Sequence, residues 1–359
     1  MPSAKSYLKN IYRIPILKDS RKGFLRLDMN ENPGGLPEKF IRRMLCHIDR
    51  QLLASYPEYA SLIQKIAIHN NIIFENICIS NGSDGAIKYI FDAYISGGDN
   101  IVLTDPTFAM YPIYCQIFDA NAVKVSYYED LSFPLDDFLG AINPDIRMAI
   151  VVNPNNPVGS ALDRGSLKKI LEKCSECDTM LVIDEAYFYY YEETCIEEIK
   201  LYSNLIVLRT FSKLCSLAGV RIGYAAACPE IVQNLYKVRP SYDVNSFAVY
   251  FAEKLLDEPQ LIMDTIKEAR KGKEFLINQL QHNGIEYREG KANFVLIKCA
   301  GHVNEIISGL YKKNILVTGN FAHNYLKEYI RVTVGSIHHM SKFCDAFFNQ
   351  WKAIDHKSP

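Results

Sequence analysis

A regular alternation of short apolar runs with helical segments, beginning near residue 77, constrains the fold of this 359-residue chain more than any other feature. Several of the runs are apolar nearly throughout, as expected for strands that helices cover on both faces of a sheet. The pattern therefore predicts an α/β fold with a mainly parallel sheet. The seven expected strands span residues 77–80, 100–104, 123–127, 148–152, 180–183, 205–208 and 222–227.

The two flanks of this region follow another pattern. The N-terminal arm contains an Asn-Pro-Gly-Gly turn and then a helix, whereas the C-terminal part begins with a long amphipathic stretch at 247–281, in which breaks are allowed. Strand-like segments at 294–298 and 330–334 follow, with a helical segment at 303–312 between them. The expected parts are the arm and part of the small domain at residues 1–45, the large domain at 46–245 and the small α+β domain at 246–359.

The charge balance of the chain limits its partners. Forty Lys and Arg residues against 41 Asp and Glu give a net charge of −1, so no cationic surplus can neutralise the phosphates of a nucleic acid. The first ten residues lack the apolar core of a signal peptide, and no apolar run approaches the ~18 residues that span a bilayer. Ten cysteines are scattered without framework spacing, which indicates reduced thiols and a cytoplasmic protein.

One cysteine pair, Cys174 and Cys177, has the C-x-x-C spacing of a metal or redox site. No second pair accompanies it, and structural metal sites of this kind usually need four ligands. The eight histidines are dispersed as well. We therefore expect no metal site.

The residues that follow each expected strand are the candidates for chemistry, because ligands of open α/β sheets bind outside the carboxyl ends of the strands. Residues 81–85 (NGSDG) lead from a strand into a helix, where free N–H groups near Ser83 and Asp84 can cradle a phosphate. Phe108, beyond the next strand, offers an aromatic face to a planar ligand. Each feature also has a plain explanation, which is a capped turn for the first and a core ring for the second.

Two more strand ends carry polar residues. Residues 153–159 (NPNNPVG) contain two Asn-Pro steps, which force an extended turn and hold its amides rigidly. Asp184 directly follows a buried strand, where a carboxylate is costly unless a cation faces it. A protonated pyridine nitrogen would be such a cation. The alternatives are a structural ion pair, or a nucleotidase Mg²⁺ site that would require a P-loop, which the sequence lacks.

Lys213 lies just past the strand 205–208, close to hydroxyl groups and to Arg221. Such surroundings can lower the pKa of a lysine, so that it acts as a nucleophilic amine. Arg221 and Ser212 together offer fork-shaped donors to a phosphate. A lone lysine is more often a surface residue, but the five features occur together and in one order, which makes the combination specific.

In this order the residues resemble fold-type I pyridoxal-phosphate enzymes, within them the class I/II aminotransferases, and most closely the histidinol-phosphate aminotransferase branch. The resemblance runs from residues 28–33 (DMNENP) to 330–335 (IRVTVG), which is nearly the whole chain. It implies a fold-type I architecture, pyridoxal 5′-phosphate as the cofactor and Lys213 as the lysine that forms the Schiff base. Asp184 would then pair with the pyridinium nitrogen, and Tyr187 would be the third catalytic residue.

The resemblance also implies the remaining cofactor contacts. Asn156 and Tyr187 would contact the phenolic oxygen of the ring, and Phe108 would stack on the ring. Tyr56 matches the tyrosine that reaches the phosphate of the partner subunit, which implies a homodimer with shared active sites. The expected phosphate ligands within one subunit are Ser83, Asp84, Ser212 and Arg221.

The implied substrate contacts include one departure from that branch. Arg331 matches the arginine that holds a carboxylate or equivalent group of the substrate, and Asn32 is the second expected contact. Thr318 stands where the histidinol-phosphate branch usually carries an arginine that binds the substrate phosphate, so one charge-assisted contact is lost. We therefore expect an aminotransferase that pairs an amino acid such as glutamate with a small phosphorylated keto substrate, or one that acts on an ordinary amino acid pair.

Two alternatives remain open. A pyridoxal-phosphate-dependent decarboxylase of a small phosphorylated amino acid would use the same cofactor residues, because the outcome depends on which α-carbon bond stands perpendicular to the ring. Carbon dioxide release without a keto acceptor would distinguish it. A ligand-sensing module of a transcription regulator would need a DNA-binding domain before the fold, and the segment before Asp28 is too short for one.

Overall fold

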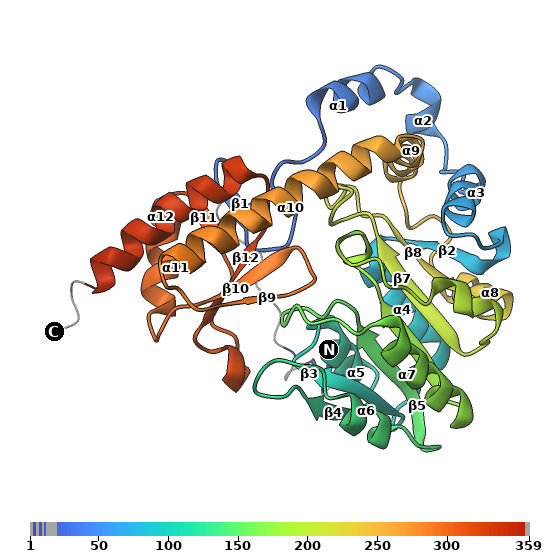
Figure 1. Cartoon of the computed structure of the whole chain (residues 1–359). Helices are drawn as coiled ribbons and strands as arrows, with labels where there is room; N and C mark the ends of the chain where they lie inside the picture. Colours follow the sequence, from blue (N-terminus) through green and yellow to red (C-terminus); the bar gives the residue numbers. More distant parts are fainter. Residues whose placement is uncertain (1–2, 5–6, 9–10, 12–19, 356–359) are drawn as a thin grey trace.

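The computed structural model of this chain describes residues 3–4, 7–8, 11 and 20–355, so most of the segment 1–10 lies outside the described residues. The α/β fold and the seven expected strands are confirmed: they form one sheet with the order β2-β8-β7-β6-β5-β3-β4 (Figure 1). Within this sheet β8 runs antiparallel to both of its neighbours, β2 and β7, and the other strand pairs are parallel. The strands are β2 (Ile77–Ser80), β3 (Asn100–Asp105), β4 (Asn121–Ser126), β5 (Ile146–Val152), β6 (Met180–Asp184), β7 (Leu205–Thr210) and β8 (Gly223–Ala227).

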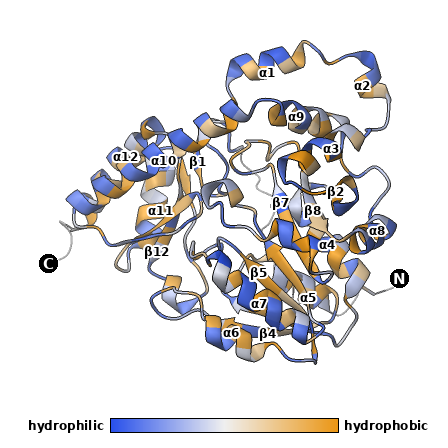
Figure 2. Ribbon diagram, turned by 45° about the vertical axis from the view of Figure 1, so that its right-hand side comes forward, coloured by the Kyte–Doolittle hydropathy of each residue, from blue (hydrophilic) through white to orange (hydrophobic). Residues whose placement is uncertain are grey.

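Helices cover both faces of this sheet. They are α3 (Ala60–His69), α4 (Gly82–Tyr94), α5 (Met110–Ile117), α6 (Leu135–Ala141), α7 (Arg164–Glu176) and α8 (Pro229–Val238). In β6, Leu181 and Ile183 pack with α3, α6 and α7, whereas Val182 packs with α4, α5 and α8. Both faces are therefore apolar, which explains the near-continuous apolar runs. Figure 2 shows these orange strands enclosed by helices that carry blue residues.

The C-terminal part builds a separate antiparallel sheet in which β10 lies between β9 and β12. The stretch 247–281 is two helices, α9 and α10, because Pro259 starts a new helix in a position where its missing N–H costs nothing. The elements are α9 (Ser246–Leu256), α10 (Pro259–His282), β9 (Tyr287–Glu289), β10 (Phe294–Lys298), α11 (Val303–Lys312), β12 (Tyr329–Thr333) and α12 (Ile337–Asp355).

The N-terminal arm returns to this C-terminal part. Its strand β1 (Leu25–Leu27) pairs in parallel with β11 (Ile315–Val317), and Leu27 is fully buried among side chains of α10, α11 and α12. The chain then passes through α1 (Glu38–Leu45) and α2 (Arg50–Ala54) to reach the large sheet. The domain boundaries after residues 45 and 245 stay a prediction.

A membrane-spanning helix and a metal site are both absent from the part of the chain that the structure describes. No helix there is long and apolar enough to cross a membrane. No group of three or more His, Cys, Asp or Glu side chains there could hold a metal ion. Cys174 and Cys177 are buried free thiols.

Candidate active site

Nine of the residues expected at the site line one cavity of about 220 Å³. They are Ser83, Asp84, Phe108, Asn156, Asp184, Tyr187, Ser212, Lys213 and Arg221. Parallel strands bring their carboxyl ends to the same edge of a sheet, so residues that follow β2, β3, β5, β6 and β7 meet here although they are far apart in sequence. Val152, Ala186 and Thr210 also line this cavity.

Asp184 ends β6 and is buried. Its Oδ2 accepts a hydrogen bond from the hydroxyl of Tyr111 at 2.8 Å, and its Oδ1 accepts one from the backbone N–H of Ala186 at 3.1 Å. Burial raises the pKa of Asp184 to about 6, because a charged carboxylate loses its hydration there. Tyr111 was missed in the sequence, although it lies three residues after Phe108. A cationic group in the cavity would stabilise the charged form of this buried carboxylate.

Lys213 lies three residues beyond β7. Its Nζ donates to the carbonyl oxygen of Met29 at 3.2 Å, so the arm contacts a residue that lines the cavity. Burial, and next the positive charge of Arg331, lower the pKa of Lys213 to about 8. An amine with this pKa is largely neutral in mildly alkaline solution and can attack an aldehyde.

A candidate anion cradle lies between the N-terminus of α4 and Arg221. Arg221 Nη1 lies 3.4 Å from Ser212 Oγ. Gly82 has a φ of 69°, and a Cβ on it would lie 2.5 Å from Arg221 Nη2. A Cβ on Gly223 would lie 2.6 Å from the backbone nitrogen of Ser83. The two glycines therefore let the guanidinium and the helix N-terminus approach the same point, as an anion would require.

Three side chains suited to orienting a flat polar ligand border the same cavity. Tyr187 is buried, and burial raises its pKa to about 12. Asn156 follows β5, and its Oδ1 accepts a hydrogen bond from Arg331. Phe108 stands edge-on to Tyr111, with 6.1 Å between the ring centroids. A hydroxyl, an amide and an aromatic ring thus surround the amine and the carboxylate.

Arg331 links the small sheet to this cavity. Its Nη2 donates to the carbonyl oxygen of Asp28 at 2.7 Å, while its buried Nε has no hydrogen-bond partner among the described residues. A guanidinium with a free donor can receive a carboxylate. Thr318 pairs with Arg331 through the backbone, and its Oγ1 donates to the same Asp28 carbonyl at 2.6 Å. The Thr318 hydroxyl is therefore already engaged.

Three expected site residues lie outside the lining of the main cavity: Arg331, which reaches it through Asn156, and also Asn32 and Tyr56. The Nδ2 of Asn32 donates to Ser216 Oγ at 2.7 Å. Tyr56 is 73% exposed and stacks on Tyr242 with 4.2 Å between ring centroids, at the wall of a second cavity of about 370 Å³. The expected roles of Asn32 and Tyr56 stay predictions.

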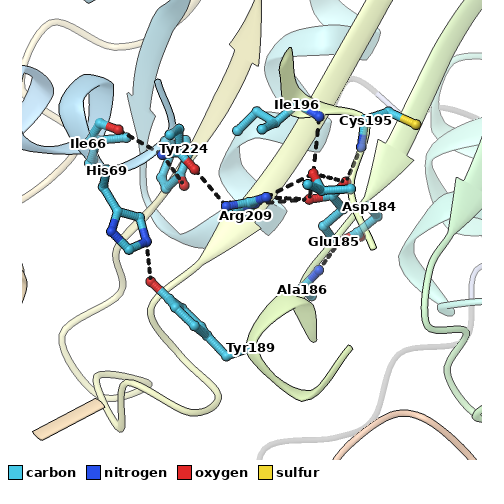
Figure 3. Close-up of polar contacts among 12 residues, drawn as sticks. Ile66, His69, Asp184, Glu185, Ala186, Tyr189, Cys195, Ile196, Arg209 and Tyr224 are labelled. Atoms are coloured by element: carbon cyan, nitrogen blue, oxygen red, sulfur yellow. Dashed lines mark hydrogen bonds and ion pairs between the residues drawn. The ribbon is translucent and has the colours of Figure 1, made fainter. Parts of the chain in front are cut away.

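A buried ion pair lies behind the site, on the face of the sheet that α3 covers (Figure 3). Side chains alternate along a strand, so Glu185 points away from the cavity that its neighbour Asp184 lines. The carboxylate of Glu185 accepts hydrogen bonds from Arg209 Nε at 2.9 Å and from Arg209 Nη2 at 2.8 Å. Thr194 donates to this carboxylate, and Arg209 Nη1 donates to Asn70 Oδ1 at 2.6 Å. Neither member of this pair was predicted as a functional residue.

Comparisons with known proteins show the family and the fold of this chain. The family described as aminotransferase class I and II matches residues 22–347. A histidinol-phosphate aminotransferase of Thermoanaerobacter pseudethanolicus is 34% identical over 315 residues, which cover 87% of this chain and 88% of that protein. The structure of a histidinol-phosphate aminotransferase from Sinorhizobium meliloti in complex with pyridoxal-5′-phosphate has a TM-score of 0.89 at 21% identity, over 99% of both chains.

A second solved structure bears on the alternative reaction. The L-threonine-O-3-phosphate decarboxylase from Porphyromonas gingivalis has a TM-score of 0.77 at 22% identity, and the match covers 90% of this chain and 98% of that one. At this identity the likeness shows the shared fold alone. The fold therefore carries both kinds of chemistry.

Proposed function

Since the chain belongs to the class I and II aminotransferase family and is a pyridoxal 5′-phosphate-dependent aminotransferase, we propose that the cavity at the strand ends is its active site. The observation that carries this proposal is the presence in one cavity of an amine and a buried carboxylate. The amine is Lys213, with a pKa of about 8, and the carboxylate is Asp184, with a pKa of about 6. Either group alone is a common feature of buried sites, whereas the two together match the needs of this cofactor.

The residues present fit the cofactor. Lys213 would bind its aldehyde, and Asp184 would face the protonated ring nitrogen, which relieves the cost of burying the carboxylate. Arg221 and Ser212 would hold the phosphate at the N-terminus of α4. Tyr187 and Asn156 would contact the phenolic oxygen.

The proposed chemistry uses Lys213 twice. The bound cofactor supplies an electron sink for the bond that breaks at the α-carbon of the substrate. Once the amino group of the substrate has displaced it from the cofactor, Lys213 Nζ would take up a proton as a general base and return it as a general acid, for which a pKa near the working pH is suited. Arg331 holds the substrate carboxylate and so fixes which α-carbon bond is broken.

We propose an amino acid such as glutamate as the amino donor and a small phosphorylated keto compound as the acceptor. The support is the name of the Thermoanaerobacter relative, a histidinol-phosphate aminotransferase. Thr318 offers no charge to a substrate phosphate, and its hydroxyl already donates to Asp28. The keto acceptor is therefore expected to differ from the ketone that would yield histidinol phosphate on receiving an amino group. The decarboxylase reaction is the second candidate, favoured only by the fold of the Porphyromonas protein.

The covalent bond to the cofactor is tested by absorbance and mass. The purified protein, supplied with the cofactor, should show a band near ~420 nm that borohydride removes while mass is added at Lys213. Lys213→Ala should lose the band and the turnover but retain part of the phosphate binding. Lys273→Ala is the matched control, because Lys273 is another partly buried lysine with a lowered pKa that lines a different cavity. An unmodified Lys213 would refute the proposal.

The substrate is tested with a panel of amino donors and phosphorylated keto acceptors, read by mass spectrometry. Transfer of the amino group from donor to acceptor supports an aminotransferase. Release of carbon dioxide from a phosphorylated amino acid, in the absence of a keto acceptor, would instead establish the decarboxylase.

We also propose a homodimer with shared active sites in the cytoplasm. An exposed aromatic pair, Tyr56 and Tyr242, supports the dimer, since such surfaces gain from burial against a partner. All ten cysteines are free, which suits a reducing compartment. When Lys213→Ala and Tyr56→Ala subunits are mixed, hybrid dimers should regain activity, because one of their two sites has both residues. No recovery in verified hybrids would exclude shared sites.

A further inference from the structure

We propose that Asn30 is a positioning residue that turns the hydroxyl hydrogen of Tyr187 toward the cofactor, which rests on the function proposed above. Asn30 lies in the arm and is only 1% exposed. Its φ is 55°, in the left-handed region that asparagine tolerates better than most residues. All four of its polar atoms have partners, which come from three other segments of the chain: Tyr187, Asn293 and Thr333.

A backbone amide fixes the direction of these hydrogen bonds. The N–H of Asn30 can only donate, so Thr333 Oγ1, at 3.1 Å, accepts from it. The Thr333 hydroxyl then gives its single hydrogen to Asn30 Oδ1 at 3.2 Å. The remaining end of the Asn30 amide is the Nδ2 donor, and it lies 2.8 Å from the hydroxyl oxygen of Tyr187. The amide therefore has one orientation that satisfies every partner.

This orientation decides what Tyr187 can do. Its oxygen accepts from Asn30, so its own hydrogen has to point elsewhere, and within the described residues no acceptor takes it. Tyr187 lines the cavity, and its hydroxyl is therefore free to donate to the phenolic oxygen of the cofactor. A donor stabilises the deprotonated form of that oxygen. It consequently lowers the pH at which the bound cofactor gives up its proton.

Charged groups from several elements also face Tyr187. Arg331 on β12 and Asp184 at the end of β6 both act on its pKa. Lys213 Nζ lies 5.9 Å from the centre of its ring, and Glu31 and Arg221 in turn act on Lys213. Substitutions at Asn30 leave all of these groups in place, so a shift caused by Asn30 can be separated from theirs.

The test is Asn30→Asp, read from the pH titration of the cofactor absorbance in the holoenzyme. A carboxylate only accepts, so it takes hydrogens from both Thr333 and Tyr187 and turns the Tyr187 hydrogen away from the cavity. The midpoint of the titration should rise by about one to two pH units, the worth of one hydrogen bond to a charged group. An unchanged midpoint would overturn the proposal.

A double-mutant cycle separates this role from a direct charge effect. In a Tyr187→Phe background, which has no hydroxyl to turn, Asn30→Asp should move the midpoint little. A shift that persists undiminished there refutes the positioning role. Thr333→Val removes the hydroxyl that fixes the Asn30 amide, so it should raise the midpoint by less than Asn30→Asp does. In the Tyr187→Phe background Thr333→Val should have no effect on the midpoint. If Asn30→Asp does not fold, Thr333→Val takes its place in the test. A wild-type protein that binds no cofactor would instead refute the proposed function.

Discussion

Tyr111 donates its hydroxyl hydrogen to the carboxylate of Asp184 across 2.8 Å, and both side chains are buried. Tyr111 lies in the first turn of α5, and Asp184 is the last residue of β6. Burial raises the pKa of Asp184 to about 6, and the Tyr111 hydrogen bond acts in the opposite direction. Tyr111 therefore helps to keep ionised the carboxylate that would face the cofactor nitrogen.

Tyr111→Phe should accordingly weaken cofactor binding by about tenfold or more, because a hydrogen bond to a buried charged group contributes about 1.5–3 kcal/mol. Asp184 has a raised pKa, and loss of the hydrogen bond raises it further, so the acid limb of binding should move to higher pH. Cofactor binding to the apo-protein between pH 5 and 8 measures both effects.

Tyr236→Phe is the matched control for this substitution, because its hydroxyl donates to the carbonyl oxygen of Ile77, at 3.3 Å on the edge strand of the sheet, and Tyr236 does not line the cavity. That variant should bind the cofactor like the wild type. An acid limb that does not move in Tyr111→Phe would show that the hydrogen bond does not control Asp184.

Gly82→Ala should weaken cofactor binding through the phosphate cradle. Its Cβ would lie 2.5 Å from Arg221 Nη2, so the guanidinium must move. Gly98→Ala is the control, since Gly98 also has a positive φ, of 89°, but a Cβ there would meet nothing within 4 Å. Both variants should lose stability of the order of 1 kcal/mol from the left-handed backbone. Only Gly82→Ala should also lose affinity for the cofactor and for inorganic phosphate; equal affinities would contradict the cradle.

The sheet was predictable because each strand carries its own signal. A strand buried on both faces is apolar nearly throughout, as β6 is up to Ile183 and β7 is up to Leu208, and the first polar residue marks the approach to the strand end. Lys213 and Asp184 were predicted as site residues in this way, and the structure places both at the cavity. The pattern says nothing of which distant segment a side chain meets. The three-residue strand β1 and its partner β11 lie about 290 residues apart in sequence, and neither is long enough to show a period.

The same limit explains the residues that were missed at the site. Tyr111 reads as one more apolar position of an amphipathic helix, and Asn30 reads as a turn residue. The alternation of side chains along a strand could place Glu185 on the face opposite Asp184. It could not identify Arg209, on the next strand, as the partner of Glu185. These contacts depend on how distant segments pack against each other. A single sequence indicates such packing only where a residue type is unusual for its position.

The Glu185–Arg209 pair should control stability more than any surface ion pair. Its side chains are 1% and 5% exposed, and removal of one partner leaves a buried charge without compensation. Arg209→Met should therefore lower the free energy of unfolding by about 3–5 kcal/mol, measured by denaturant titration. Glu38→Gln, which breaks the exposed pair with Arg42, should change stability little.

A compensating double variant completes this prediction. Arg209→Met combined with Glu185→Leu removes both charges, and buried ion pairs replaced by apolar residues of similar volume often cost little. The double variant should recover much of the stability that Arg209→Met loses. If it is as unstable as the single variant, the loss comes from packing around Phe188, whose ring the Arg209 guanidinium covers at 3.4 Å, and not from the unpaired charge.

The pH dependence of cofactor attachment should report the pKa of Lys213. Only the neutral amine attacks an aldehyde, and burial together with Arg331 lowers the pKa of Lys213 to about 8. The rate of covalent attachment to the apo-protein should therefore rise with pH and level off above about 8, with about a tenth of the amine already neutral at pH 7. Arg331→Met removes a positive charge, raises the pKa of Lys213 and should move the midpoint to higher pH. Arg288→Met, at an exposed position, should not move it. Stopped-flow absorbance measures the rates, and a wild-type midpoint near that of a solvent-exposed lysine would show that Lys213 is not activated by its surroundings.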